Sequence, residues 1–146
     1  KGAFKIRPRR LSNEKAKIID LLSDSKVLKK GLVGIAVGFG NTDPQGIASD
    51  EGKLRKTQLT LLNPSYEGSE LLFPLGVKGA STCHGDSGGP IYMNLKGKLT
   101  LIGVASRGTG ADCKNVSIFT NVAAHLDFIR QSVKSLSQSD NQHPQL

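Results

Sequence analysis

Short apolar runs alternate with turns rich in glycine, proline and asparagine over most of the chain beyond residue 30. Residues 57–62 alternate between polar and apolar side chains before Asn63-Pro64, which predicts a half-buried strand that ends there. Lys96-Gly97-Lys98 separates two apolar runs and predicts a hairpin. In all, we expect strands at residues 32–39, 57–62, 71–75, 91–95, 99–106 and 116–120.

The spacing of apolar residues becomes helical after Asn121, which is well placed as an N-cap. A shorter helix is predicted over residues 14–22, with Asn13 as its N-cap. Residues 137–146 are polar and form a tail. The apolar face of the longer helix consists of Val122, Leu126, Ile129, Val133 and Leu136.

These elements predict an all-β fold, a small antiparallel β-barrel that carries a C-terminal helix. A chain of 146 residues can bury one hydrophobic core. Its composition indicates neither a disordered protein nor a membrane span. We therefore expect one globular domain with appendages.

The net charge of +8 is concentrated in the first 30 residues, where ten Lys or Arg stand against three acidic residues and leave +7. Such a segment can attract phosphates or anionic lipid. Its one aromatic residue is Phe4, and it contains no nucleic-acid-binding motif, so we interpret it as a solvated basic linker. We expect neither nucleic acid nor a membrane as a partner.

The two cysteines, Cys83 and Cys113, suit one disulfide, although two free buried thiols are the alternative. A metal site needs more ligands at closer spacing, and the three histidines are scattered, so we expect no metal. A disulfide implies an oxidising compartment, and hence a secreted protein, extracellular or periplasmic. The chain begins with Lys1 instead of Met and shows no signal peptide, so we expect a processed chain or a fragment.

Residues 82–90, Thr-Cys-His-Gly-Asp-Ser-Gly-Gly-Pro, carry the strongest chemical signal. A nucleophilic serine needs hydrogen-bond donors aimed at the oxyanion that develops on the attacked carbonyl. Flanking glycines let backbone N–H groups turn inward, and Gly85 and Ser87 would supply them. This stretch resembles the nucleophile loop of the trypsin and chymotrypsin family of serine endopeptidases.

The resemblance continues through residues 37–40, 103–108 and 116–129 and covers about residues 31–136. It implies the C-terminal Greek-key barrel and terminal helix of a chymotrypsin-like domain. Residues 1–30 would then be the segment between two barrels, and residues 137–146 the tail. The first barrel is expected upstream in the same polypeptide or on a separate chain.

By position, Ser87 would be the nucleophile, and Gly85 and Ser87 the oxyanion-hole donors. Asp86 would pair with a newly freed N-terminal amine on activation, and His84 would line the leaving-group side of the cleft. The resemblance also pairs Cys83 with Cys113. Ser106 and Gly108 would offer backbone hydrogen bonds to an extended protein or peptide substrate.

The resemblance also implies a specificity pocket with Ser81 at its floor. A neutral serine cannot pair with a cationic side chain, which favours a hydrophobic or mixed preference over a tryptic one. Gly108 keeps one wall open, whereas Ser117 stands where the family usually has glycine and narrows the pocket. Arg107 replaces a common aromatic residue and makes the entrance more polar.

The family activates its serine with a histidine that an aspartate orients, and both are expected outside this chain. His84 lies on the serine's own loop and His125 on the C-terminal helix, and we interpret both as bystanders to proton transfer. Two hypotheses follow. One is a secreted serine endopeptidase without cofactor, of which this chain is the nucleophile-bearing half. The other is a non-catalytic protease-like binding module.

Overall fold

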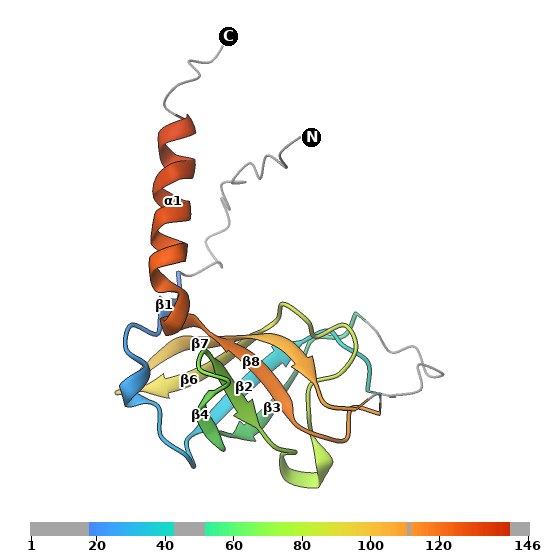
Figure 1. The fold of residues 1–146 in the computed structure, drawn as a ribbon. Helices are drawn as coiled ribbons and strands as arrows, with labels where there is room; N and C mark the ends of the chain where they lie inside the picture. The colour runs from blue at the N-terminus through green and yellow to red at the C-terminus, as the bar shows by residue number, and fades with distance from the viewer. Residues whose placement is uncertain (1–17, 43–51, 111, 141–146) are drawn as a thin grey trace.

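The computed structural model describes residues 18–42, 52–110 and 112–140 (Figure 1). Within them the chain forms mostly β-structure followed by one α-helix, α1 (Leu126–Asp140), with three short 3₁₀ helices, η1 (Ser25–Val27), η2 (Val77–Gly79) and η3 (Val122–His125). The strands are β1 (Asp20–Leu21), β2 (Val33–Gly38), β3 (Arg55–Thr60), β4 (Asn63–Tyr66), β5 (Glu70–Phe73), β6 (Pro90–Leu95), β7 (Lys98–Gly108) and β8 (Ser117–Asn121).

Seven strands follow one another in the order β3-β2-β6-β7-β8-β5-β4, each antiparallel to its neighbour, and β1 adds a parallel pair to β7. The two ends of this order are consecutive in sequence. Leu61 N donates to Leu32 O at 2.8 Å, and Leu62 N donates to Leu72 O at 2.9 Å. The sheet therefore curls back toward itself, and the predicted antiparallel barrel fold with a C-terminal helix is confirmed.

The inner faces of the strands meet in one apolar core. Phe73 on β5 and Phe119 on β8 are fully buried, with ring centroids 5.4 Å apart and ring planes at 78°, an edge-to-face contact that favours the ring quadrupoles. Ile91 and Ile102 are equally inaccessible to solvent. This core fixes β6, β7 and β8, the strands that hold the loop around Ser87.

The predicted strands are confirmed with small shifts at their ends, but the helix predicted over 14–22 is wrong in its described part, and two short strands, β1 and β4, were not predicted. The described part of the predicted helix over 14–22 contains β1, and the N–H of Leu22, the residue after β1, donates to Leu101 O at 2.9 Å. Burial of Leu22 in the core outweighs a short helical pattern that would be marginal alone. Asn13 and residues 14–17 lie outside the described residues.

The strand predicted over 57–62 stops before Asn63-Pro64, since β3 ends at Thr60, but a strand that was not predicted, β4, begins at Asn63. Pro64 has no N–H to donate, yet it is tolerated because β4 stands at the end of the strand order and its pairing with β5 is irregular between Asn63 and Tyr66. The chain thus continues from β3 into β4 with only Leu61 and Leu62 between them.

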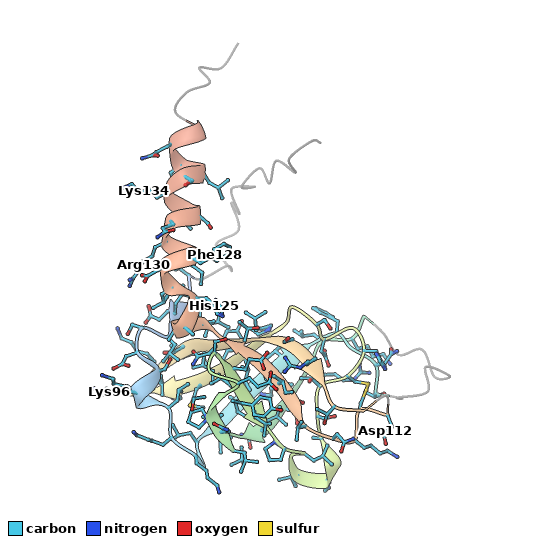
Figure 2. The ribbon with its side chains drawn as sticks, in the orientation of Figure 1. Lys96, Asp112, His125, Phe128, Arg130 and Lys134 are labelled. Carbon is cyan, nitrogen blue, oxygen red and sulfur yellow. A yellow bond between two sulfur atoms is a disulfide. The ribbon has the colours of Figure 1, made fainter. Side chains whose placement is uncertain are left out.

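Asn121 caps the C-terminal helical segment as predicted, since its side-chain oxygen accepts a hydrogen bond from Ala123 N at 3.0 Å. The first turn is 3₁₀, and α1 follows. Helix α1 extends away from the barrel (Figure 1), and Figure 2 labels Phe128, Arg130 and Lys134 along it. Phe128, Val133 and Leu136 are 70%, 58% and 54% exposed. None of the described helices is long and apolar enough to cross a membrane.

Candidate active site

Two tight turns shape the loop that carries Ser87. Asp86 N donates to Cys83 O at 3.0 Å, and Gly89 N donates to Asp86 O at 2.9 Å. Gly85 and Gly88 adopt φ values of +92° and +79°, a region that residues with side chains rarely enter. The glycines on either side of Asp86 and Ser87 are therefore conformational requirements, and Ser87 is exposed at the tip.

The far end of the loop is anchored to β7. Gly88 N donates to Ala105 O at 2.9 Å, and Ala105 N donates to Gly89 O at 2.8 Å. A Cβ atom on Gly89 would approach Asp86 O to 2.8 Å. The close approach of these backbones explains the second glycine after the serine, and it ties Ser87 to the most extensively paired strand of the barrel.

The Asp86 carboxylate holds the near side of the loop. Its Oδ1 accepts from Gly40 N at 2.9 Å, and its Oδ2 accepts from Cys83 N at 3.0 Å. A Cβ on Gly38 would lie 1.9 Å from Oδ1, and one on Gly40 would lie 2.5 Å from the carboxyl carbon. The Gly-Phe-Gly turn is thus shaped to receive this carboxylate.

A cavity of about 210 Å³ adjoins the nucleophile loop. Pairing of β7 with β6 ends at Val104, so the stretch from Ser106 to Gly108 is paired only with β8 among the described strands. Thr109 N donates to the carbonyl oxygen of Val116, the residue just before β8. Because backbone groups alternate in direction along a strand, the N–H and C=O of the preceding residue, Gly108, point away from β8, toward the unpaired edge of β7. The cavity walls include Ser87, His84, Ser106, Arg107, Gly108 and Val116.

Ser81 and Ser117 are not among the described residues that line this cavity, where the resemblance placed them. The hydroxyl of Ser81 donates to the carbonyl of Cys113. Ser117 is 1% exposed, and its Oγ accepts from Thr82 N at 3.1 Å and from Thr82 Oγ1 at 2.9 Å. The Thr82 contacts were not anticipated from the sequence.

Cys83 and Cys113 form the disulfide, which joins the nucleophile loop to the segment before β8. A second cavity of about 390 Å³ lies on the other side of the loop. Asn41 and Asp86 line it, and Asn41 Oδ1 is buried without a hydrogen-bond partner in the described chain. Ser81 lines this second cavity.

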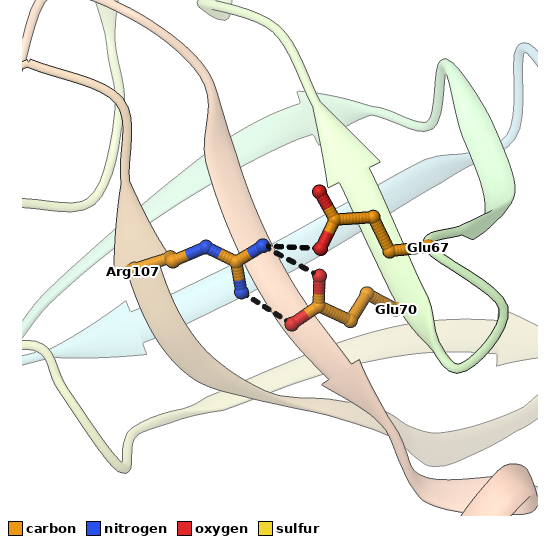
Figure 3. A network of polar contacts seen from close by, with 3 residues as sticks. All are labelled: Glu67, Glu70 and Arg107. Carbon is orange, nitrogen blue, oxygen red and sulfur yellow. Dashed lines mark hydrogen bonds and ion pairs between the residues drawn. The ribbon is translucent and has the colours of Figure 1, made fainter.

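Arg107 makes contacts that the sequence did not indicate (Figure 3). Its guanidinium grips both oxygens of Glu70, with Nη2 2.8 Å from Oε2, and donates to Glu67 Oε2 at 3.1 Å. The hydrogen bond from Arg107 lowers the pKa of Glu70 below its ordinary 4.5, and the same bond raises the pKa of Arg107. The two glutamates lie 37 and 40 residues away from Arg107 in the sequence. The pairing of the strands brings the three side chains together in one ion-pair cluster.

This cluster predicts a pH-dependent contribution to stability. Folding lowers the pKa of Glu70, so the ionised carboxylate stabilises the folded state. This stabilisation is complete above pH 4.5, the ordinary pKa, and is lost as the pH falls through the lowered pKa. We expect Glu70→Gln in the full-length polypeptide to reduce the free energy of unfolding at neutral pH, and this loss to shrink in acid. Denaturant melts across this pH range measure it, and the comparison is Asp127→Asn on α1, whose exposed ion pair with Arg130 should give a smaller effect. A loss that stays constant with pH contradicts the prediction.

Of the two described histidines, His84 lines the cavity beside Ser87 and His125 does not. His84 is exposed on the loop itself, where its carbonyl accepts from Asn41 N at 2.9 Å, and His125 belongs to η3. Within the described ranges, no group of three or more His, Cys, Asp and Glu side chains could hold a metal ion.

Comparisons with known proteins agree with this geometry. The family model for trypsin matches residues 4–129. A CLIP domain-containing serine protease B4 of Anopheles gambiae is 34% identical over 117 residues, which are 70% of this chain and 31% of that protein. Human tissue-type plasminogen activator is 42% identical over 53 residues, 36% of this chain and 9% of that protein. Rabbit (Oryctolagus cuniculus) vitamin K-dependent protein C is 35% identical over 69 residues, 45% of this chain and 15% of that protein.

The chain therefore spans less than a third of the length of these relatives. The family match nevertheless covers most of its residues, including the whole nucleophile loop and both cysteines. The barrel, the glycine-shaped serine loop and the extent of this match together place the chain in the trypsin family of serine proteases.

Proposed function

We propose that this chain is the nucleophile-bearing half of a secreted serine endopeptidase domain. The observation that carries the proposal is the loop itself: two left-handed glycines and a carboxylate bound by two backbone N–H groups present Ser87 at the mouth of a cavity. Gly85 and Ser87 supply the N–H groups of the oxyanion hole. A serine that is merely exposed on the surface does not require a turn with two left-handed glycines and a hydrogen-bonded carboxylate.

In the proposed reaction, Ser87 Oγ attacks the carbonyl carbon of the scissile peptide bond while its proton passes to a histidine outside this chain. The negative charge on the carbonyl oxygen is held by the N–H groups of Gly85 and Ser87. The histidine returns the proton to the leaving amine, and an acyl-enzyme on Ser87 Oγ remains. Water, activated by the same histidine, releases the acid product and restores the serine.

The substrate is an extended peptide that adds to the free edge of β7 beside Ser87. Ser106 and Gly108 offer backbone groups there, as in β-strand addition at a sheet edge. The charged residues that line the cavity are Asp86, whose carboxylate is bound by Gly40 and Cys83, and Arg107, which pairs with glutamates. Among the described residues, a cationic side chain thus meets no available carboxylate inside the cavity. This supports a hydrophobic or mixed preference at the cleaved residue.

Asp86 is also proposed as the activation carboxylate, which pairs with a newly freed N-terminal amine. The cavity of about 390 Å³ beside it could admit such a terminus. Asn41 Oδ1, buried without a partner among described residues, adds a hydrogen-bond acceptor in that cavity. A buried acceptor gains free energy from an ammonium donor, which supports this assignment.

The exposed apolar face of α1 supports the proposal that a further barrel covers it. Val133 and Leu136 lie on this face and are each more than half exposed, and Phe128, on another side of the helix, is 70% exposed. A separate domain rarely keeps so many large apolar side chains in water. The covering barrel carries the histidine and aspartate, either upstream in the same polypeptide or on a separate chain. A histidine and an aspartate of the family type in the upstream coding sequence would support this assignment, and their absence would contradict it.

A fluorophosphonate probe, which reacts with activated serines, tests the proposed function. We expect rapid labelling of Ser87 in the activated full-length product and poor labelling of the 146-residue chain. Rapid stoichiometric labelling of the 146 residues would refute the assignment of the base to another segment. A folded full-length protein that neither labels nor cleaves any peptide would favour the alternative, a protease-like binding module.

A further inference from the structure

The ion-pair cluster of Arg107, Glu67 and Glu70 borders the path that a substrate would take. Arg107 lines the cavity beside Ser87, and it lies between Ser106 and Gly108 on the free edge of β7. Side chains alternate in direction along an extended peptide, so a peptide on this edge places one residue in the cavity and neighbours outside it. A substrate residue paired opposite Arg107 would share the face of the sheet on which the arginine side chain lies.

The guanidinium of Arg107 has three carboxylate oxygens as hydrogen-bond acceptors. Arg107 is paired with Ile118 on β8, and Ile118 with Leu72 on β5, so the arginine side chain crosses over β8 to reach Glu70. Directly paired residues share a face of the sheet, and here Ile118 and Leu72 are buried. With both Glu70 oxygens and one Glu67 oxygen as its acceptors, Arg107 is committed to these contacts.

The three side chains together carry two negative charges and one positive charge. The Glu70 side chain is 15% exposed and is gripped at both oxygens, whereas Glu67 is 61% exposed and contacts Arg107 through Oε2 alone. The cluster therefore presents a net negative charge, with Glu67 as its most accessible carboxylate. The charge of Arg107, which by sequence makes the entrance more polar, is neutralised by its partners.

We propose that this cluster selects substrates with a basic residue upstream of the cleaved bond and disfavours those with an acidic one. The inference rests on the proposed function and adds a second determinant to it, because the cavity itself favours a neutral side chain. Glu67 is the specificity-determining residue, and Arg107 positions it. Measured interactions between exposed charges are about 0.2–1 kcal/mol each, so preferences of a few fold are expected.

The test uses the activated full-length polypeptide and a peptide series that carries Lys, Gln or Asp at each of the three positions before the cleaved bond. We expect kcat/KM for Lys to exceed that for Asp by about fivefold at one of these positions at low salt. Raising the salt concentration lowers the ratio, because exposed charges are screened.

Two variants move the ratio of Lys to Asp in opposite directions. Glu67→Gln removes the net negative charge and lowers the ratio, whereas Arg107→Gln makes the cluster more negative and raises it. Asp127→Asn removes the same charge from α1 and leaves the ratio unchanged. Glu67 is exposed on a turn, so its substitution leaves the core untouched.

Each outcome supports or overturns the inference. A preference for Asp would mean that Arg107 leaves its glutamates to bind the substrate, and an unchanged ratio in Glu67→Gln would mean that the cluster has a structural role only. Either result overturns the inference while fluorophosphonate labelling and cleavage of the Gln peptides uphold the proposed function. Loss of both labelling and cleavage in the parent protein overturns the two together.

Discussion

Replacing Ser87 with alanine in the activated full-length polypeptide should lower kcat for peptide cleavage by a factor of about 10⁴ to 10⁶. In the proposed mechanism only Ser87 Oγ forms the acyl-enzyme, while the proposed oxyanion donors at Gly85 and position 87 are backbone groups that survive the substitution. Residual catalysis would come from those donors and from substrate binding. Steady-state kinetics at saturating peptide concentration measure the loss, and KM should change much less than kcat.

Ser135→Ala on α1 is the matched control, since Ser135 is exposed and far along the chain from the loop. Its kcat and its fluorophosphonate labelling should equal those of the parent protein. If Ser87→Ala retained even a tenth of the parent's kcat, the measured activity would arise elsewhere. A parent protein that binds peptides equally well with and without the Ser87 hydroxyl, and cleaves none, would identify a binding module.

The barrel could be predicted from the sequence because the ends of its strands are marked by turn and cap residues whose effect is local. Lys96 and Gly97 adopt φ values of 52° and 82° at the β6–β7 turn, the left-handed pair that a tight hairpin requires. Asn121 caps the following helix through a local bond to Ala123 N. Such features act over two or three residues, so the sequence alone reveals them.

The errors arose where distant contacts decide the structure. Residues 18–22 have a weak helical pattern, but pairing of β1 with Thr100 and Leu101 fixes them as extended chain. Pro64 is a strand breaker by itself and is tolerated only because β4 lies at the end of the strand order. Local propensity predicts neither the pairing of β1 with β7 nor the position of β4 at the end of the strand order.

In the candidate site, too, local features were predicted from the sequence and long-range contacts were not. The roles proposed for Ser87, Gly85 and Asp86 follow from a contiguous motif, and the structure adds the reason for the glycines at 38 and 40, which leave room for the Asp86 carboxylate. The partners of Arg107 come from β4 and β5 and depend on the register across three strands. Ion pairs between residues so far apart in the sequence can be identified only from the folded structure.

The loop's dependence on Asp86 leads to a second large effect, which we expect from Gly38→Ala. The added methyl group would lie 1.9 Å from Asp86 Oδ1, so the carboxylate must leave the Gly40 N–H that it now accepts from. Its neighbours Gly85 and Ser87 then shift, and a displacement of about 1 Å at a reacting atom can cost about 10²-fold in rate. We expect a loss of that size in fluorophosphonate labelling.

The matched control for Gly38→Ala is Gly97→Ala in the β6–β7 turn, where a methyl group meets nothing within 4 Å. Its φ of +82° makes alanine strained, so this variant should be destabilised by about 1 kcal/mol while its labelling rate stays that of the parent. The comparison separates general destabilisation from displacement of the loop. If folded Gly38→Ala labels as fast as Gly97→Ala, then Ser87 is positioned by its bonds to β7 alone, and the Asp86 carboxylate does not set the geometry of the oxyanion hole.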